Sequence, residues 1–146
     1  SVQDIQVTNA DPKQVLDLGE GATLKVVTTG PRGAILLVEW KNFRTLLPIG
    51  MSFEALDELQ NGAKIGPVSV LSLADAGYAA SNPPEWIANL NPEIVELSVD
   101  AADQNGMPDS SVLDSIKDYE LLRTDKNGWI EITSDGNEMW VNVERK

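Results

Sequence analysis

The sequence predicts an α/β fold. Two observations predict it: the first apolar segments follow one another through short turns, and the later ones alternate with helical patterns. The length of 146 residues is enough for one hydrophobic core and too short for two ordinary domains. We therefore expect a single domain over residues 1–146, with residues 1–15 as a loose arm.

The first strands are predicted from their apolar spacing. Residues 22–29 alternate between apolar and polar side chains, and residues 34–40 are almost continuously apolar. The Gly-Pro-Arg-Gly sequence at 30–33 has turn chemistry, so these two strands should form a hairpin, and a third strand should follow at 43–47. Arg32 at this turn is interpreted as a hairpin tip, with anion binding as the alternative.

The second half reads as alternating helices and strands. Ser52 is expected as the N-cap of a short helix, and a second helix over 83–90 should have Ser81 or Asn82 as its N-cap. A third helix should follow Asp109 or Ser110. Strands are predicted between and after these helices, at 67–73, 93–99 and 119–124.

The chain closes with a predicted hairpin over 128–143 around an Asp-Gly turn. A two-residue turn would place Ile130 opposite Val141 on one side of this hairpin. It would make Trp129 and Trp140 diagonal neighbours on the other side. We expect a helix to cover that tryptophan pair; ligand stacking is the alternative.

Composition restricts the possible partners. Asp and Glu total 23 against 11 Lys and Arg, giving a net charge of −12. A phosphate polyanion would be repelled over most of this surface, so we expect no nucleic-acid binding through this domain alone. No apolar run approaches the roughly 18 residues of a membrane span, so we expect no direct membrane insertion.

The residue types needed for most metal and acid–base chemistry are missing. The chain has no histidine and no cysteine, which removes the usual zinc ligands and the commonest general base. Only carboxylate chemistry remains, and we expect no bound cofactor.

Four segments carry a family resemblance: FRTLLPIGM at 43–51, VLSLADAGYAAS at 70–81, NGMPDSSVLDSI at 105–116 and LLRTDKNGWIEITSDGNEMWV at 121–141. Together they resemble the C-terminal half of a metallo-β-lactamase-like domain, in the branch found in competence proteins of DNA uptake, over roughly residues 17–143. The best-matched positions are Gly77, Ser81, Gly106, Pro108, the Arg123-Thr124-Asp125 run and Gly128. The resemblance implies half of an αββα sandwich, that is, a mixed sheet with helices on one face.

The resemblance also implies a cleft without its metal ligands. Met51 stands where the family has a metal-bridging aspartate, Asp75 and Ala76 replace paired histidines before Gly77, and Met107 replaces another histidine. The family's His-x-His-x-Asp-His motif cannot be present in a chain without histidine. The residues of this vestigial cleft are Met51, Asp75, Ala76, Gly77, Asp100, Met107 and Asp109.

Two functions follow as expectations. The first is a non-catalytic, degenerate domain without enzymatic activity of its own, which acts as a structural or partner-binding module of a larger competence-type protein. A lone half would leave an apolar sheet face exposed, so a homo-oligomer or an upstream half of the parent should cover it. Such a parent would be membrane-anchored with this domain outside the cytoplasm, or the chain would be a stand-alone soluble relative.

The second function is a metal-dependent, nuclease-like hydrolase completed by an upstream half or a partner chain. Asp75 would then bind Mg²⁺ or Mn²⁺ together with Asp100, Asp103 or Asp109. The competing interpretation is favoured: Asp109 caps a helix, and the other carboxylates are solvated loop residues.

Overall fold

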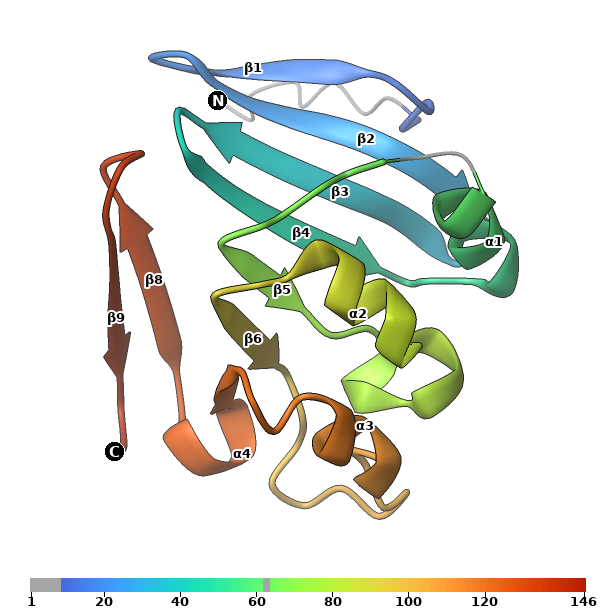
Figure 1. The fold of residues 1–146 in the computed structure, drawn as a ribbon, viewed down its shortest axis with the longest axis vertical. Helices are drawn as coiled ribbons and strands as arrows, with labels where there is room; N and C mark the ends of the chain where they lie inside the picture. The colour runs from blue at the N-terminus through green and yellow to red at the C-terminus, as the bar shows by residue number, and fades with distance from the viewer. Residues whose placement is uncertain (1–8, 62–63) are drawn as a thin grey trace, which may run out of the picture.

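The computed structural model describes residues 9–61 and 64–146 and shows an α/β protein built on a seven-stranded mixed sheet (Figure 1). The strands lie side by side in chain order. Their bounds are β1 Val15–Gly19, β2 Ala22–Gly30, β3 Gly33–Trp40, β4 Phe43–Ile49, β5 Val70–Ser72, β6 Ile94–Leu97 and β7 Glu120–Arg123. The predicted α/β class and mixed sheet are confirmed.

The sheet has an antiparallel part and a parallel part. Strands β1 to β4 form a meander of tight hairpins, whereas β4 to β7 pair in parallel. Parallel neighbours need a crossover connection, and helices supply it here. These helices are α1 (Phe53–Asn61), α2 (Pro84–Leu90) and α3 (Ser110–Ser115), with two 3₁₀ turns, η1 (Asp75–Gly77) and η2 (Ala79–Ser81), before α2.

The three crossover helices pack against one face of the sheet. Ile35, Leu46, Leu71 and Val95 of the sheet are each 0% exposed beneath them. The helices contribute apolar side chains to the same core, namely Ala55, Leu56, Leu59, Trp86, Ile87, Leu90 and Val112. We call this the helix-covered face, and burial of its apolar surface is the main stabilising term of the fold.

A C-terminal hairpin packs on the opposite face. It consists of β8 (Ile130–Ser134) and β9 (Met139–Val143), which follow the short helix α4 (Thr124–Asn127). Its inward side chains pack on a second cluster built from Val70, Ile94 and Leu122, with Phe43 beside it. In Figure 1 the hairpin stands at one end of the sheet strands and crosses their direction. It therefore covers only part of this face.

The rest of that face, over β1 to β4, remains partly exposed. The strand registers place six apolar side chains there, which we call the open patch: Leu16, Leu24, Leu36, Val38, Leu47 and Ile49. Leu16 and Ile49 are 46% and 58% exposed, and the other four are partly buried, although Val26 in the same row is only 3% exposed. In the part of the chain that the structure describes, no helix packs over this patch.

The beginning of the fold differs from the prediction. Strand β1 was not expected; it pairs with β2 through a turn of Gly19, Glu20 and Gly21, all with positive φ. Pairing extends to Lys13, whose N–H donates to Val26 O at 2.8 Å. Of the predicted arm, residues 1–8 lie outside the described residues.

The predicted register of the C-terminal hairpin is wrong by two residues. Ile130 lies opposite Val143, and Ser134 lies opposite Met139, so the loop has four residues rather than two. Trp129 and Trp140 are consequently not diagonal neighbours. No helix of the described residues covers them either: they are 56% and 48% exposed.

Candidate functional site

The loop after β5 has an unusual backbone. Asp75, Ala76 and Gly77 all have positive φ, at 46°, 53° and 85°. Such a conformation costs a non-glycine residue free energy, so the surroundings must hold it in place. This loop contains three of the predicted cleft residues in sequence.

Asn82 holds the loop from beneath. It is 1% exposed, accepts a hydrogen bond from the Ala74 N–H at 2.9 Å, and donates to the carbonyl oxygens of Ala74 and Tyr78 at 2.9 and 2.7 Å. Asn82 was predicted as a helix cap, and that is wrong: the N-cap of α2 is Pro83. Its carboxamide instead satisfies the backbone groups of the loop.

Gly77 and Asp109 join this loop to the segment before α3. A Cβ on Gly77 would lie 2.6 Å from Pro108 Cβ, so only glycine permits this approach. The Asp109 N–H donates to Gly77 O at 3.1 Å, and Asp109 Oδ2 accepts from the Ala79 N–H at 2.7 Å. Asp109 does stand at the predicted N-cap of α3, but its side chain bonds the neighbouring loop and not the helix.

The carboxylate of Asp75 is bonded to two side chains of the protein. Arg32 Nη2 lies 2.9 Å from Asp75 Oδ1, and the Ser81 hydroxyl donates to Asp75 Oδ2 at 2.7 Å. Arg32 lies in the β2–β3 turn as predicted, and the anion that it binds is a carboxylate of the same chain. Both oxygens of Asp75 thus already accept hydrogen bonds.

The two methionines of the predicted cleft, Met51 and Met107, contact the apolar core. Met51 is 2% exposed, and Met107 packs partly buried against the same core beneath the helices. A cavity of about 310 Å³ remains beside Met51, lined by residues 31–32, 51–54, Tyr78 and Ser81. A thioether is a weak ligand for hard or borderline cations, so Met51 gives this cavity an apolar wall rather than a ligand.

The carboxylates of the hydrolase alternative are engaged in local contacts. Asp100 is exposed and accepts from the Ala102 N–H at 2.9 Å, whereas Asp103 accepts from the backbone of Asn105 and Met107. In residues 9–61 and 64–146 we find no group of three or more Asp or Glu side chains arranged to hold a metal ion. The structure places Asp75 and Asp109 in one loop cluster, held by different protein partners, and does not add Asp100 as a third ligand.

The Arg123-Thr124-Asp125 run has a structural role. Arg123 Nη2 lies 2.7 Å from Asp125 Oδ2. The Thr124 hydroxyl donates to Val99 O at 2.8 Å and accepts from the Val99 N–H at 2.9 Å. The hydrogen bond from Arg123 lowers the pKa of Asp125, outweighing the opposing effect of burial. The run therefore joins the ends of β6 and β7.

The bonding partners of two residues that organise this site, Arg32 and Asn82, could not be predicted from the sequence. Arg32 lies 43 positions from Asp75 along the chain. The role of Asn82 depends on a turn in which Asp75 and Ala76 have positive φ. Neither residue predicts such a turn in the sequence. The only available signal was the presence of an Arg and an Asn in turn-rich segments, which many surface loops share.

Comparison with known proteins gives no family assignment. No protein-family model matches the chain, and no curated protein matches it. The metallo-β-lactamase-like interpretation stays a prediction carried by the segments quoted above. No helix in the described residues is long and apolar enough to cross a membrane.

Proposed function

We propose that this chain is a non-catalytic, degenerate metallo-β-lactamase-like domain that serves a larger competence-type protein as a structural or partner-binding module. The observation that carries the proposal is the state of Asp75, which is bonded by Arg32 and Ser81 beside the buried thioether of Met51. A cation at Asp75 would have to displace an arginine that already neutralises it. The loop contains neither histidine nor cysteine, so the side chains that usually hold a hydrolytic metal are absent from it.

Metal analysis tests the non-catalytic part. The purified chain is incubated with excess Mn²⁺, Zn²⁺ or Mg²⁺, dialysed, and measured for retained metal by elemental analysis. We expect far less than one ion per chain. Near-stoichiometric metal that is lost in Asp75→Asn would overturn the proposal and favour the hydrolase alternative. Asp114→Asn, on the exposed side of α3, is the control and should then retain the metal.

The open patch supports the partner-binding part. Six apolar side chains on one face of β1 to β4 are partly or largely exposed, whereas the helix-covered face is closed. Contiguous apolar surface of this kind is typical of an interaction site. Two copies together would carry −24, twice the −12 of one chain, and this repulsion favours an upstream half of the parent over a second copy.

Sedimentation velocity tests which occupant covers the patch. If an upstream half of the parent covers the open patch, the isolated chain should be monomeric at micromolar concentration in 0.15 M salt. A dimer that Leu47→Asp dissociates would favour the second copy. Glu131→Asp on the outer side of the hairpin serves as the matched control, because it leaves both charge and patch unchanged.

A further inference from the structure

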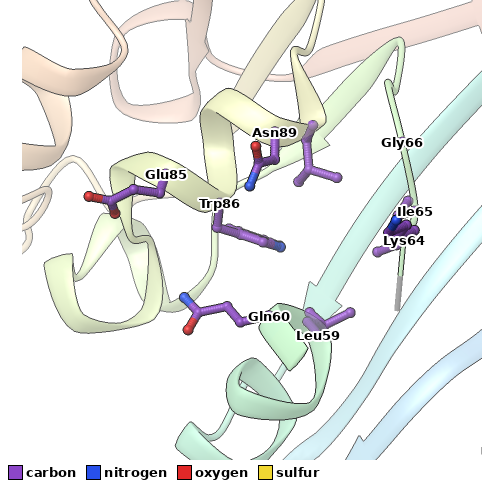
Figure 2. A pocket seen from close by; sticks show the side chains of 9 residues that line it. Leu59, Gln60, Lys64, Ile65, Gly66, Glu85, Trp86 and Asn89 are labelled. Carbon is purple, nitrogen blue, oxygen red and sulfur yellow. The ribbon is translucent and has the colours of Figure 1, made fainter. Parts of the chain in front are cut away.

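A second cavity lies on the helical side of the molecule, away from the loop described above. It has a volume of about 690 Å³ and lies between the end of α1, the segment 64–66 and α2 (Figure 2). Its apolar lining comes from Leu59, Ile65, Trp86 and Leu90. The volume is in the range of pockets that enclose a ligand or a bound side chain.

Trp86 gives this cavity an unused hydrogen-bond donor. The residue is 6% exposed, and within the described part of the chain its indole N–H donates to no group. In Figure 2 the ring extends from α2 into the cavity with its nitrogen end foremost. Among the described residues no buried side-chain nitrogen or oxygen lacks a partner, so this N–H is open to the solvent in the cavity. An acceptor that enters from outside can therefore take the place of water at the indole.

The rim offers both donors and acceptors. Gln60 from α1 and Asn89 from α2 are exposed carboxamides, and Asn89 turns toward the ring in Figure 2. Neither side chain bonds another described group. A carboxamide can donate to a carbonyl and accept from an N–H, which are the two groups that repeat along a peptide backbone.

The negative charge of the protein indicates that a bound peptide should be positively charged. The two helices that wall the cavity carry exposed acids, namely Glu54, Asp57, Glu58 and Glu85. Lys64 is the basic residue among those that line it. With a chain that is −12 overall, a peptide with flanking lysines or arginines meets favourable long-range attraction.

We propose that this cavity binds an apolar side chain of an extended, basic peptide segment of a partner protein, with a backbone carbonyl of that peptide accepting the hydrogen bond from Trp86. This deepens the partner-binding part of the proposed function, on which it rests, and it uses a surface separate from the open patch. Tryptophan at the centre of an apolar pocket with a polar rim is the usual composition of an interaction hot spot.

The experiment is a titration followed by the indole ¹H–¹⁵N signals of the four tryptophans. The probe is acetyl-Lys-Val-Leu-Val-Lys-amide, the control peptide is acetyl-Lys-Gly-Ser-Gly-Lys-amide, and benzyl alcohol tests a small apolar molecule. Trp86→Phe assigns the Trp86 signal. We expect the apolar peptide to move that signal downfield and saturably, and to leave those of Trp40, Trp129 and Trp140 in place.

Two variants keep the test independent of folding defects at Trp86. Asn89→Ala on the surface should weaken peptide binding about three- to tenfold, the loss of one hydrogen bond, whereas Gln104→Ala in a distant exposed loop should not change it. No movement of the Trp86 signal, equal movement with the Gly-Ser-Gly peptide, or saturation by benzyl alcohol alone would each overturn the inference. Since this readout involves neither metal nor oligomeric state, its failure is distinguishable from failure of the proposed function.

Discussion

Strand β3 contributes to both faces of the sheet, and its adjacent residues experience different surroundings. Leu37 points under the helices and is 5% exposed, whereas Leu36 points to the open patch and is only partly buried. Three helices close one face, and on the other the hairpin reaches only as far as the second cluster and Phe43. The fold of this chain therefore depends on one complete core, and the incomplete face is free for another role.

The largest expected effect compares these two leucines. Leu37→Ala should lower the free energy of unfolding by about 2–5 kcal/mol, because it leaves a cavity in a closed core. Leu36→Ala should cost less than about 1.5 kcal/mol, because water already reaches that side chain. Urea unfolding of both variants measures the difference. Equal losses would show that the open patch is as well packed as the helix-covered face.

A second prediction tests how closely the loop on the helical side is fitted. Gly77→Ala should destabilise the protein by about 2–4 kcal/mol, because the new methyl group meets Pro108 and the backbone has φ 85°. Gly106→Ala is the matched control: its φ is 75°, but nothing lies within 4 Å of the added Cβ. It should cost only about 1–2 kcal/mol, the conformational part alone. Equal thermal unfolding of the two variants would contradict the packing argument.

A third prediction uses acid to probe the link between the sheet and the hairpin. Asp125 is 19% exposed and its pKa is lowered below the ordinary 3.8 by the hydrogen bond from Arg123. Because the folded pKa is lowered, the pair stabilises the protein above pH 3.8 and loses this effect as the pH falls through the folded pKa. Asp125→Asn should therefore cost about 1–2 kcal/mol at pH 7 and progressively less below pH 3.8.

Unfolding of both proteins between pH 7 and pH 2 measures this convergence. Asp114→Asn, an exposed position on α3, controls for the general effect of removing a carboxylate. A difference between wild type and Asp125→Asn that stays constant over the whole range would show that the ion pair is not its source.

The helical side of the fold was largely predictable from sequence because its signals are local. Ser52 begins α1 as predicted, with its hydroxyl accepting the Ala55 N–H at 3.3 Å. The three helices and all the expected strands are present, with shifted ends. Strand β1 was missed because its apolar signal is short: Val15, Leu16 and Leu18 surround a single Asp17, and all five of its residues are exposed. It exists through its pairing with β2.

The hairpin register was missed for a different reason. Side chains in its loop bond the backbone: the Ser134 hydroxyl donates to Glu138 O at 2.7 Å, and Asp135 Oδ1 accepts from the N–H groups of Asn137 and Glu138 at 2.8 Å. These bonds stabilise a four-residue loop over the two-residue turn that Asp-Gly usually indicates. The Arg32–Asp75 pair could not be predicted either, because tertiary structure and not local spacing brings the two residues together.

The smallest expected effect concerns the outer side of the hairpin, where Trp140 lies opposite Thr133 and is 48% exposed. In the isolated chain Trp140→Thr should change the free energy of unfolding by less than about 0.5 kcal/mol, because the residue is largely exposed and belongs to neither core cluster of the described structure. Ile132→Thr, on the inner side of the same hairpin, is the control and should cost more, since it removes a contact with the second cluster. Urea unfolding measures both losses of free energy. A larger loss for Trp140→Thr than for Ile132→Thr would show that the outer side of the hairpin is already packed in the free chain. The hairpin would then not fit the contrast between a closed and an open face.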